Sequence, residues 1–149
     1  QRDLKGRARL VKRVEPLSIV SIHVNWHREK GSKGAIVYYQ KGEEAGKLLA
    51  ELIQKELNLI QTTVREARPG NFYVLRNTEA PGVLIELGFI SNNEDLKGLL
   101  DEAHLKRQAQ AIMVGLEIFL QQGGAYKGIN PAMRPGLDHH GIYHGENIF

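Results

Sequence analysis

The chain has no cysteine, only two methionines and a single tryptophan among its 149 residues. The absence of cysteine excludes disulfides and thiolate metal sites, so any metal must be held by histidine and carboxylate side chains. The sequence also has no run of about 20 apolar residues, which a membrane-spanning helix needs. With 42% hydrophobic and 25% charged residues, the composition is that of a globular domain with enough apolar content for a core.

Positive charge is concentrated at the start of the chain. Residues 1–13 hold six Lys or Arg and one Asp, a net charge of +5, whereas the whole chain carries +3. Such a cluster can bind an anionic polymer, either nucleic acid or cell-wall glycan with its acidic peptides. The simpler interpretation is the solvated face of an amphipathic helix, because Leu4, Ala8 and Val11 recur at helical spacing. We favour the helix and expect no nucleic-acid partner.

Alternating strand and helix patterns predict one α/β domain over residues 1–121. The expected strands cover residues 18–24, 35–39, 71–76 and 82–87, and the expected helices cover residues 3–13, 43–60, 94–100 and 102–121. This order is typical of a sheet flanked by helices, here a mixed, mostly parallel one.

Residues 122–149 differ in character, because glycine and proline recur there without any periodicity. This composition predicts a disordered tail. The tail also holds His139, His140, His144 and Glu146, and histidine-rich tracts can bind transition metals. We favour disorder, because neighbouring glycines remove the rigidity that a preorganised metal site needs.

Two apolar segments each contain one ionisable residue. His23 stands near the end of the run 17–25, and Glu86 stands inside the run 81–89. Both segments are predicted to be short buried strands, where an unpaired imidazole or carboxylate loses hydration worth several kcal/mol. A metal ion and its bound water are one pair of partners that would compensate. The alternatives are a backbone carbonyl for His23 and an ion pair with Arg76 for Glu86.

The same segments resemble a known family, the zinc-dependent N-acetylmuramoyl-L-alanine amidases. Residues 21–25, Ser-Ile-His-Val-Asn, are similar to the family's "SIHxN" strand. Residues 74–77 and 81–92 are similar to its "VLR…PAVLVEVGFLSN" stretch. The likeness runs from about residue 3 to about residue 121, and it is strongest to the germination-type amidases of the spore cortex.

The resemblance implies a function for four residues. His23 would be a ligand of Zn²⁺, Glu86 would be the catalytic residue, and Arg76 and Asn77 would position the muramyl peptide. The reaction implied is hydrolysis of the amide between N-acetylmuramic acid and L-alanine in peptidoglycan. It would take place in the cell wall or outside the cell, for example in the spore cortex or periplasm, during sporulation or germination. His27 and His104 match no family ligand, so we expect the first to be a surface residue and the second to be structural.

One part of the family pattern has no counterpart before His23. The family opens with a "DPGHGG" turn and a helix, which supply a histidine and a glutamate ligand. We therefore expect an N-terminally truncated amidase-like domain with one of three zinc ligands, an uncovered sheet edge or apolar face, and a tendency to self-associate. The alternative to an active enzyme is a non-catalytic peptidoglycan-binding remnant, and metal content would separate the two.

Overall fold

The computed structural model describes residues 2–14 and 16–123. Residues 124–149, with the predicted tail's His139, His140, His144 and Glu146, lie outside the described residues. Nine elements follow one another: α1 (Arg2–Val14), β1 (Ile19–Asn25), β2 (Ile36–Tyr39), α2 (Glu44–Asn58), β3 (Arg68–Pro69), α3 (Tyr73–Arg76), β4 (Gly82–Phe89), α4 (Asn93–Leu99) and α5 (Glu102–Gln121). No helix in these two ranges is long and apolar enough to cross a membrane.

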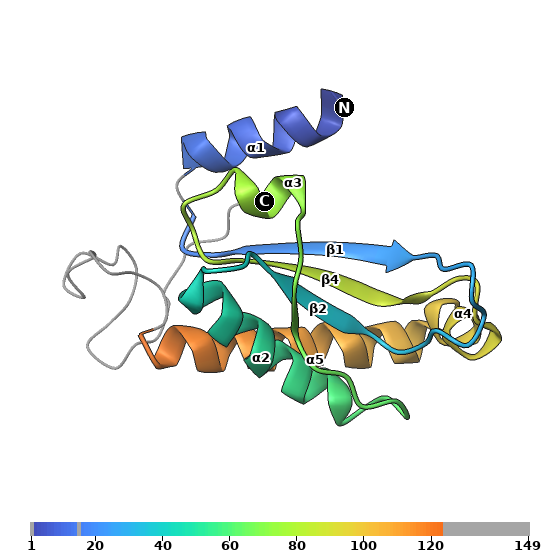
Figure 1. Ribbon diagram of the computed structural model, residues 1–149. Coiled ribbons are helices and arrows are strands. Elements are labelled where there is room, and N and C mark those ends of the chain that lie inside the picture. The colour runs from blue at the N-terminus through green and yellow to red at the C-terminus, as the bar shows by residue number, and fades with distance from the viewer. Residues whose placement is uncertain (1, 15, 124–149) are drawn as a thin grey trace.

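The four strands form one sheet in the order β1-β4-β2-β3. The pairs β1/β4 and β2/β3 are parallel, whereas β2 and β4 run antiparallel. The predicted α/β fold with a mixed sheet and flanking helices is confirmed (Figure 1). β1 and β3 are the two edge strands of this sheet.

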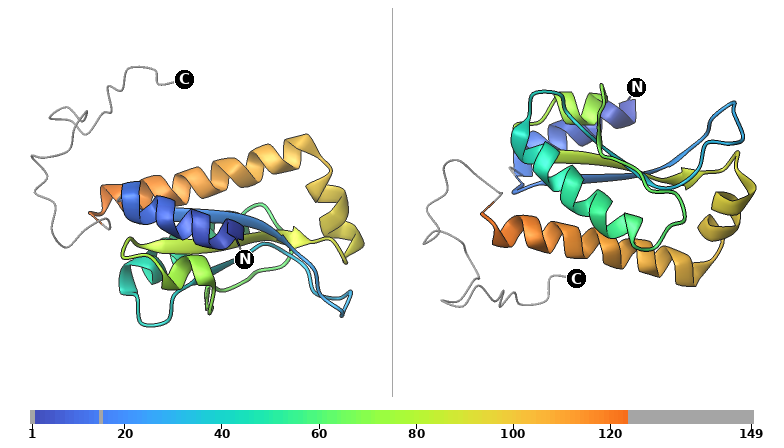
Figure 2. Two further views of the ribbon diagram at one scale, coloured as in Figure 1. Left: turned by 90° about the horizontal axis from the view of Figure 1, so that it is seen from above. Right: turned by 60° about the horizontal axis from the view of Figure 1, so that its bottom comes forward.

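Helices cover both faces of the sheet. α2 and α5 lie on one face, and α1 and α3 lie on the other (Figures 1 and 2). The main core lies between the sheet and the α2/α5 layer, and its fully buried large side chains are Val37, Leu49, Ile53, Leu57, Val83, Ile85 and Phe119. Each such side chain contributes about 1.5–3 kcal/mol by leaving water.

α2 and α5 approach each other closely at Gly115. A Cβ atom added there would lie 2.7 Å from the Cα of Ile53 and 2.8 Å from its backbone nitrogen. Only glycine leaves room for this contact, because real Cβ atoms do not approach backbone atoms so closely. The helix pair that supports the sheet therefore depends on one small residue.

The expected strand over residues 71–76 is wrong. Residues 73–76 form the short helix α3, and the strand beside β2 lies earlier, at Arg68–Pro69. In a strand, Val74 and Leu75 would point to opposite faces. The helical turn instead buries both against Leu84 of the sheet. Tertiary packing thus overrides the strand propensity of this aromatic and β-branched segment.

β1 leaves an apolar edge uncovered among the described residues. Ile22 is 54% exposed and Val24 is 50% exposed, although both lie in a strand. Val20, which shares the side of Ile22 by strand alternation, packs against the main core. An exposed apolar face on an edge strand is therefore present, as expected for an uncovered sheet edge or apolar face, and self-association through it stays a prediction.

Candidate functional site

His23 and Glu86 lie side by side on neighbouring strands. They are register partners in the parallel pair β1/β4, so their Cα atoms are aligned across the ladder. Partners in such a pair point to the same face of the sheet. The adjacency implied by the family resemblance is thus present in the fold, although the roles of the two residues stay predictions.

The face that carries this pair is the one beneath α1 and α3. Val83 and Ile85, which alternate with Glu86 along β4, point into the core between the sheet and the α2/α5 layer. Leu84 shares the side of Glu86 and packs against Val74 and Leu75, at α3. The sheet therefore separates the candidate site from the main core.

The His23 ring is held by a side chain from its own strand. Ser21 Oγ lies 2.7 Å from His23 Nε2, and Ser21 is only 8% exposed. Burial, and then the positive charge of Arg7, lowers the pKa of the His23 imidazole below its ordinary value. A neutral imidazole is the form that ligates metals. The hydroxyl of Ser21, and not a backbone carbonyl, is thus the partner of His23, and this orienting role was not predicted.

Glu86 has a buried carboxylate oxygen without a partner. Its Oε2 atom is inaccessible to water and accepts no hydrogen bond within residues 2–14 and 16–123. Burial raises the pKa of the Glu86 carboxyl above its ordinary value. The alternative of an ion pair with Arg76 is wrong, because no ion pair or hydrogen bond of the described residues joins the two side chains. Arg76 Nη1 donates to Asn71 Oδ1 at 2.7 Å. Leaving a buried acceptor unpaired costs about 1–3 kcal/mol of folding free energy. A buried polar group that stays unpaired at this cost calls for an explanation, and a functional role is one.

Arg76 and Asn77 lie at the other end of β4. Asn77 Nδ2 donates to the carbonyl of Tyr73 at 2.8 Å, so both side chains are engaged locally. Both residues lie at the end of α3, and α3 packs against Gly82, the first residue of β4. Glu86 lies four residues further along the strand, about 13 Å away. The structure does not bring Arg76 and Asn77 into contact with the His23–Glu86 pair through any hydrogen bond or ion pair of the described residues.

The described residues do not form a complete zinc site. No group of three or more His, Cys, Asp or Glu side chains in this part of the chain converges to hold a metal ion. His23 offers one ligand, and Glu86 offers an unpaired oxygen beside it. A catalytic zinc in a hydrolase usually has three protein ligands. The donor set found here therefore fits one part of such a site and not the whole.

The loop after β1 is fixed to the end of β4. The backbone nitrogen of His27 donates to Ser91 Oγ at 3.1 Å, and the His27 ring meets Phe89 edge-on, with 6.5 Å between ring centroids. His27 is exposed, as expected for a surface residue. Trp26, beside it, is 65% exposed at the carboxyl end of β1. The carboxyl ends of β1 and β4, the two strands that carry His23 and Glu86, are thus held together by contacts of His27.

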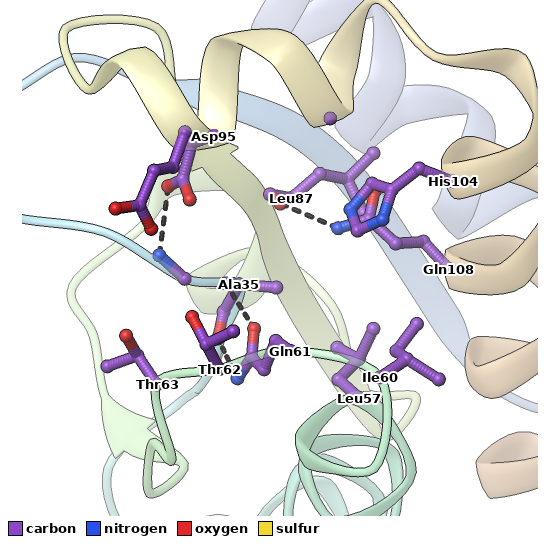
Figure 3. Close-up of a pocket in the computed structure, with 13 residues that line it drawn as sticks. Ala35, Leu57, Ile60, Gln61, Thr62, Thr63, Leu87, Asp95, His104 and Gln108 are labelled. Carbon is purple, nitrogen blue, oxygen red and sulfur yellow. Dashed lines mark hydrogen bonds between the residues drawn. The ribbon is translucent and has the colours of Figure 1, made fainter.

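A cavity of about 280 Å³ lies on the opposite side of the sheet, between α2, α4 and α5 (Figure 3). Gln108 Nε2 donates there to the carbonyl of Leu87 at 2.8 Å, and His104 lies next to it. Neither His23 nor Glu86 lines this cavity. It is therefore separate from the candidate site, and His104 belongs to it.

Comparison with known proteins places the chain in one family. A family model described as N-acetylmuramoyl-L-alanine amidase matches residues 1–118. The chain belongs to the N-acetylmuramoyl-L-alanine amidase family. The germination-specific N-acetylmuramoyl-L-alanine amidase of Bacillus subtilis (strain 168) is 32% identical over 124 residues, which cover 81% of this chain and 52% of that protein.

Other relatives of this amidase-family chain agree. The probable cell wall amidase LytH of Staphylococcus epidermidis is 37% identical over 118 residues, 78% of this chain and 36% of that protein. The structure of the CwlD amidase from Clostridioides difficile, solved in complex with the GerS lipoprotein, superposes with a TM-score of 0.77 at 34% identity, covering 80% of this chain and 62% of that one. The chain spans about half the length of these curated relatives or less.

Proposed function

We propose that this chain acts in the hydrolysis of the amide bond between N-acetylmuramic acid and L-alanine in peptidoglycan. The observation that carries the proposal is the alignment of His23 with Glu86, whose Oε2 atom is buried and unpaired. A desolvated carboxylate beside a neutral histidine is suited to proton transfer at an amide. Membership of the amidase family supports the same reaction.

In this proposal Glu86 moves the proton. Its carboxylate takes a proton from the water that attacks the amide carbon. It then returns that proton to the nitrogen of L-alanine as the carbon–nitrogen bond breaks, which leaves the carboxyl group on the muramic acid. The raised pKa brings the group closer to neutral pH, where an acid and base of this kind transfers protons most efficiently.

We also propose that His23 is one ligand of a zinc ion and that Ser21 orients its ring. The remaining ligands would have to come from outside the described residues, which hold no complete set. A hydrogen bond to one ring nitrogen fixes the orientation and tautomer of a ligating histidine, and Ser21 Oγ supplies this bond. Arg76 and Asn77 would hold the substrate beyond the amino end of β4, where their local hydrogen bonds now keep them.

The site of action follows from the proposed substrate. Peptidoglycan lies in the cell wall, so the protein would work there or outside the cell. The names of the relatives, one a germination-specific amidase and one a probable cell wall amidase, support this location. The spore cortex is the finer assignment that the germination-specific relative favours.

The second candidate function is binding without catalysis, favoured by the incomplete metal-ligand set of the described residues. Incubation of the chain with purified peptidoglycan and zinc distinguishes the two. An amidase releases peptides that begin with L-alanine and exposes their new amino groups. A binding remnant sediments with peptidoglycan and releases none. Loss of both release and sedimentation would contradict both functions.

A further inference from the structure

A row of aligned residues crosses the sheet beside Glu86. Tyr38 is the register partner of Leu84 on β4 and of Arg68 on β3. Leu84 and Glu86 are two residues apart in one strand, so their side chains share a face. The same side of the sheet therefore carries Arg68, Tyr38 and Glu86. Arg68 is on β3, which lies two strand spacings, about 10 Å, from β4.

Arg68 offers an exposed guanidinium group whose interaction with the rest of the described chain is the electrostatic one with Tyr38. It is exposed, and no hydrogen bond or ion pair of residues 2–14 and 16–123 involves it. The other arginines nearby differ, because Arg65 Nε donates to the carbonyl of Lys33 at 3.0 Å and Arg76 donates to Asn71. Arg68 is thus an exposed arginine on the face of Glu86 whose guanidinium makes no hydrogen bond or ion pair with the described residues.

Tyr38 supplies a second donor between Arg68 and Glu86. Its ring packs on Phe72, with 5.1 Å between centroids and a 60° angle, which fixes the direction of the hydroxyl. Burial, and then the charge of Glu86, raises the pKa of the Tyr38 hydroxyl, while Arg68 and Arg65 act in the opposite direction. The hydroxyl therefore keeps its proton at neutral pH and lies within electrostatic reach of both Glu86 and Arg68.

We propose that Arg68 and Tyr38 form an anion subsite that binds a carboxylate on the peptide side of the substrate. This inference rests on the proposed amidase function. A guanidinium fork and a hydroxyl donor match the planar carboxylate group, with two charge-assisted hydrogen bonds from the arginine. Glu86 is itself acidic and would repel the carboxylate. It lies on β4, one strand away from Tyr38 on β2.

The chemistry of the substrate sets its direction across the sheet. In an N-acetylmuramoyl peptide the carboxyl group of the sugar forms the scissile amide, so the free carboxylates lie on the peptide. With the amide at Glu86 on β4, the peptide extends over β2 and β3 toward Arg68. The sugar then lies toward β1 and the exposed Trp26.

A binding experiment tests the subsite without turnover. The chain, kept in EDTA, is titrated with N-acetylmuramoyl-L-alanyl-D-glutamate and with the same compound after amidation of both carboxyl groups. We expect the acid to bind about tenfold more tightly, the effect of one charge-assisted contact. Arg68→Ala should abolish this preference, whereas Arg68→Lys should keep part of it because the charge remains without the fork.

Two controls make the result specific. Arg107→Ala removes an exposed arginine on α5, across the sheet, and should leave the preference unchanged. Tyr38→Phe keeps the ring contact with Phe72 and should weaken binding of the acid alone, by a few fold. Equal affinity of the acid and the amide for the unchanged chain would overturn the subsite and leave the proposed function standing. If neither the acid nor the amide binds the unchanged chain, both the subsite and the proposed function are contradicted.

Discussion

The hydroxyl of Ser21 lies 2.7 Å from Nε2 of His23, two residues along the same edge strand. Because residues i and i+2 of a strand share a face, the serine sits beside the ring on the side where Glu86 also points. A histidine whose ring is held in this way presents one nitrogen in a fixed direction. The contact with Ser21 thus orients the His23 ring in the absence of any ligand.

Ser21→Ala should therefore release the His23 ring. We expect a mixture of imidazole tautomers in place of a single one, and a loss of about 1 kcal/mol of stability from the lost hydrogen bond. Long-range ¹H–¹⁵N NMR of the histidine side chains reports the tautomers. Ser32→Ala is the control, because Ser32 contacts His27 and not His23. An unchanged His23 spectrum in Ser21→Ala would show that the serine does not orient the ring.

Glu86→Gln should stabilise the fold at neutral pH. Burial raises the pKa of Glu86 above its ordinary value of 4.5, so between that value and the raised one the folded state binds more protons than the unfolded state. Stability therefore falls as pH rises through this window. Removing the carboxylate should raise the free energy of unfolding at pH 7, and this gain should vanish at pH values below the ordinary pKa.

Urea denaturation at several pH values measures this difference. Glu94→Gln is the opposite-sign control, because the hydrogen bond from Lys33, and then its charge, lowers the pKa of Glu94. That carboxylate favours folding above its ordinary pKa, so its removal should not stabilise the protein at pH 7. A Glu86→Gln variant that is less stable than the unchanged chain at pH 7 would mean that Glu86 has a stabilising partner.

Gly115→Ala should destabilise the protein by about 1–3 kcal/mol, the usual cost of overpacking. The added methyl group would meet the backbone of Ile53, so α2 and α5 would have to separate. Gly6→Ala on α1 is the matched control, because nothing lies within 4 Å of its added Cβ atom. That variant should be neutral or gain about 0.5–1 kcal/mol from helix propensity. Thermal unfolding of both variants checks the contrast, which equal melting temperatures would contradict.

The exposed edge at β1 should make the chain self-associate as its concentration rises. Ile22 and Val24 present apolar side chains on an edge strand, the arrangement that pairs with another chain. Ile22→Lys should reduce association, because an edge lysine opposes strand pairing. Leu59→Lys replaces an equally apolar residue, 74% exposed beyond α2, and should not. Light scattering over a concentration series gives the answer, and a monomer at every concentration would contradict the expectation.

Sequence reasoning located the candidate pair because both residues interrupt apolar runs. His23 and Glu86 stand out as ionisable groups in predicted strands, and the motif around each one assigns the chemistry. Their adjacency could not be derived from periodicity, since it depends on the pairing of strands about 60 residues apart in sequence. The family resemblance supplied that step.

The parts that sequence reasoning missed depend on tertiary packing. Val74 and Leu75 lie in a segment with strong strand propensity, and only their joint burial against Leu84 explains why it is helical. Sequence reasoning did not single out Tyr38 and Arg68, the residues of the proposed anion subsite, because they come together through the register of β2 with β3 and β4. Alternation within residues 35–39 shows that Tyr38 faces away from Val37, but not which partners share its side.

The most direct test of the account is the rate of peptide release from N-acetylmuramoyl-L-alanyl peptides, measured together with bound zinc. It is made on the chain itself and on a chimera that adds the part of the germination-specific relative that this chain does not span. In the chimera, we predict that Glu86→Gln lowers the rate by about 10²–10⁴ while zinc stays bound, and that His23→Ala loses zinc and activity together. Glu79→Gln, at an exposed turn, should change neither. Full activity in Glu86→Gln would contradict the central claim, because the amide would then be cleaved without the proposed acid and base.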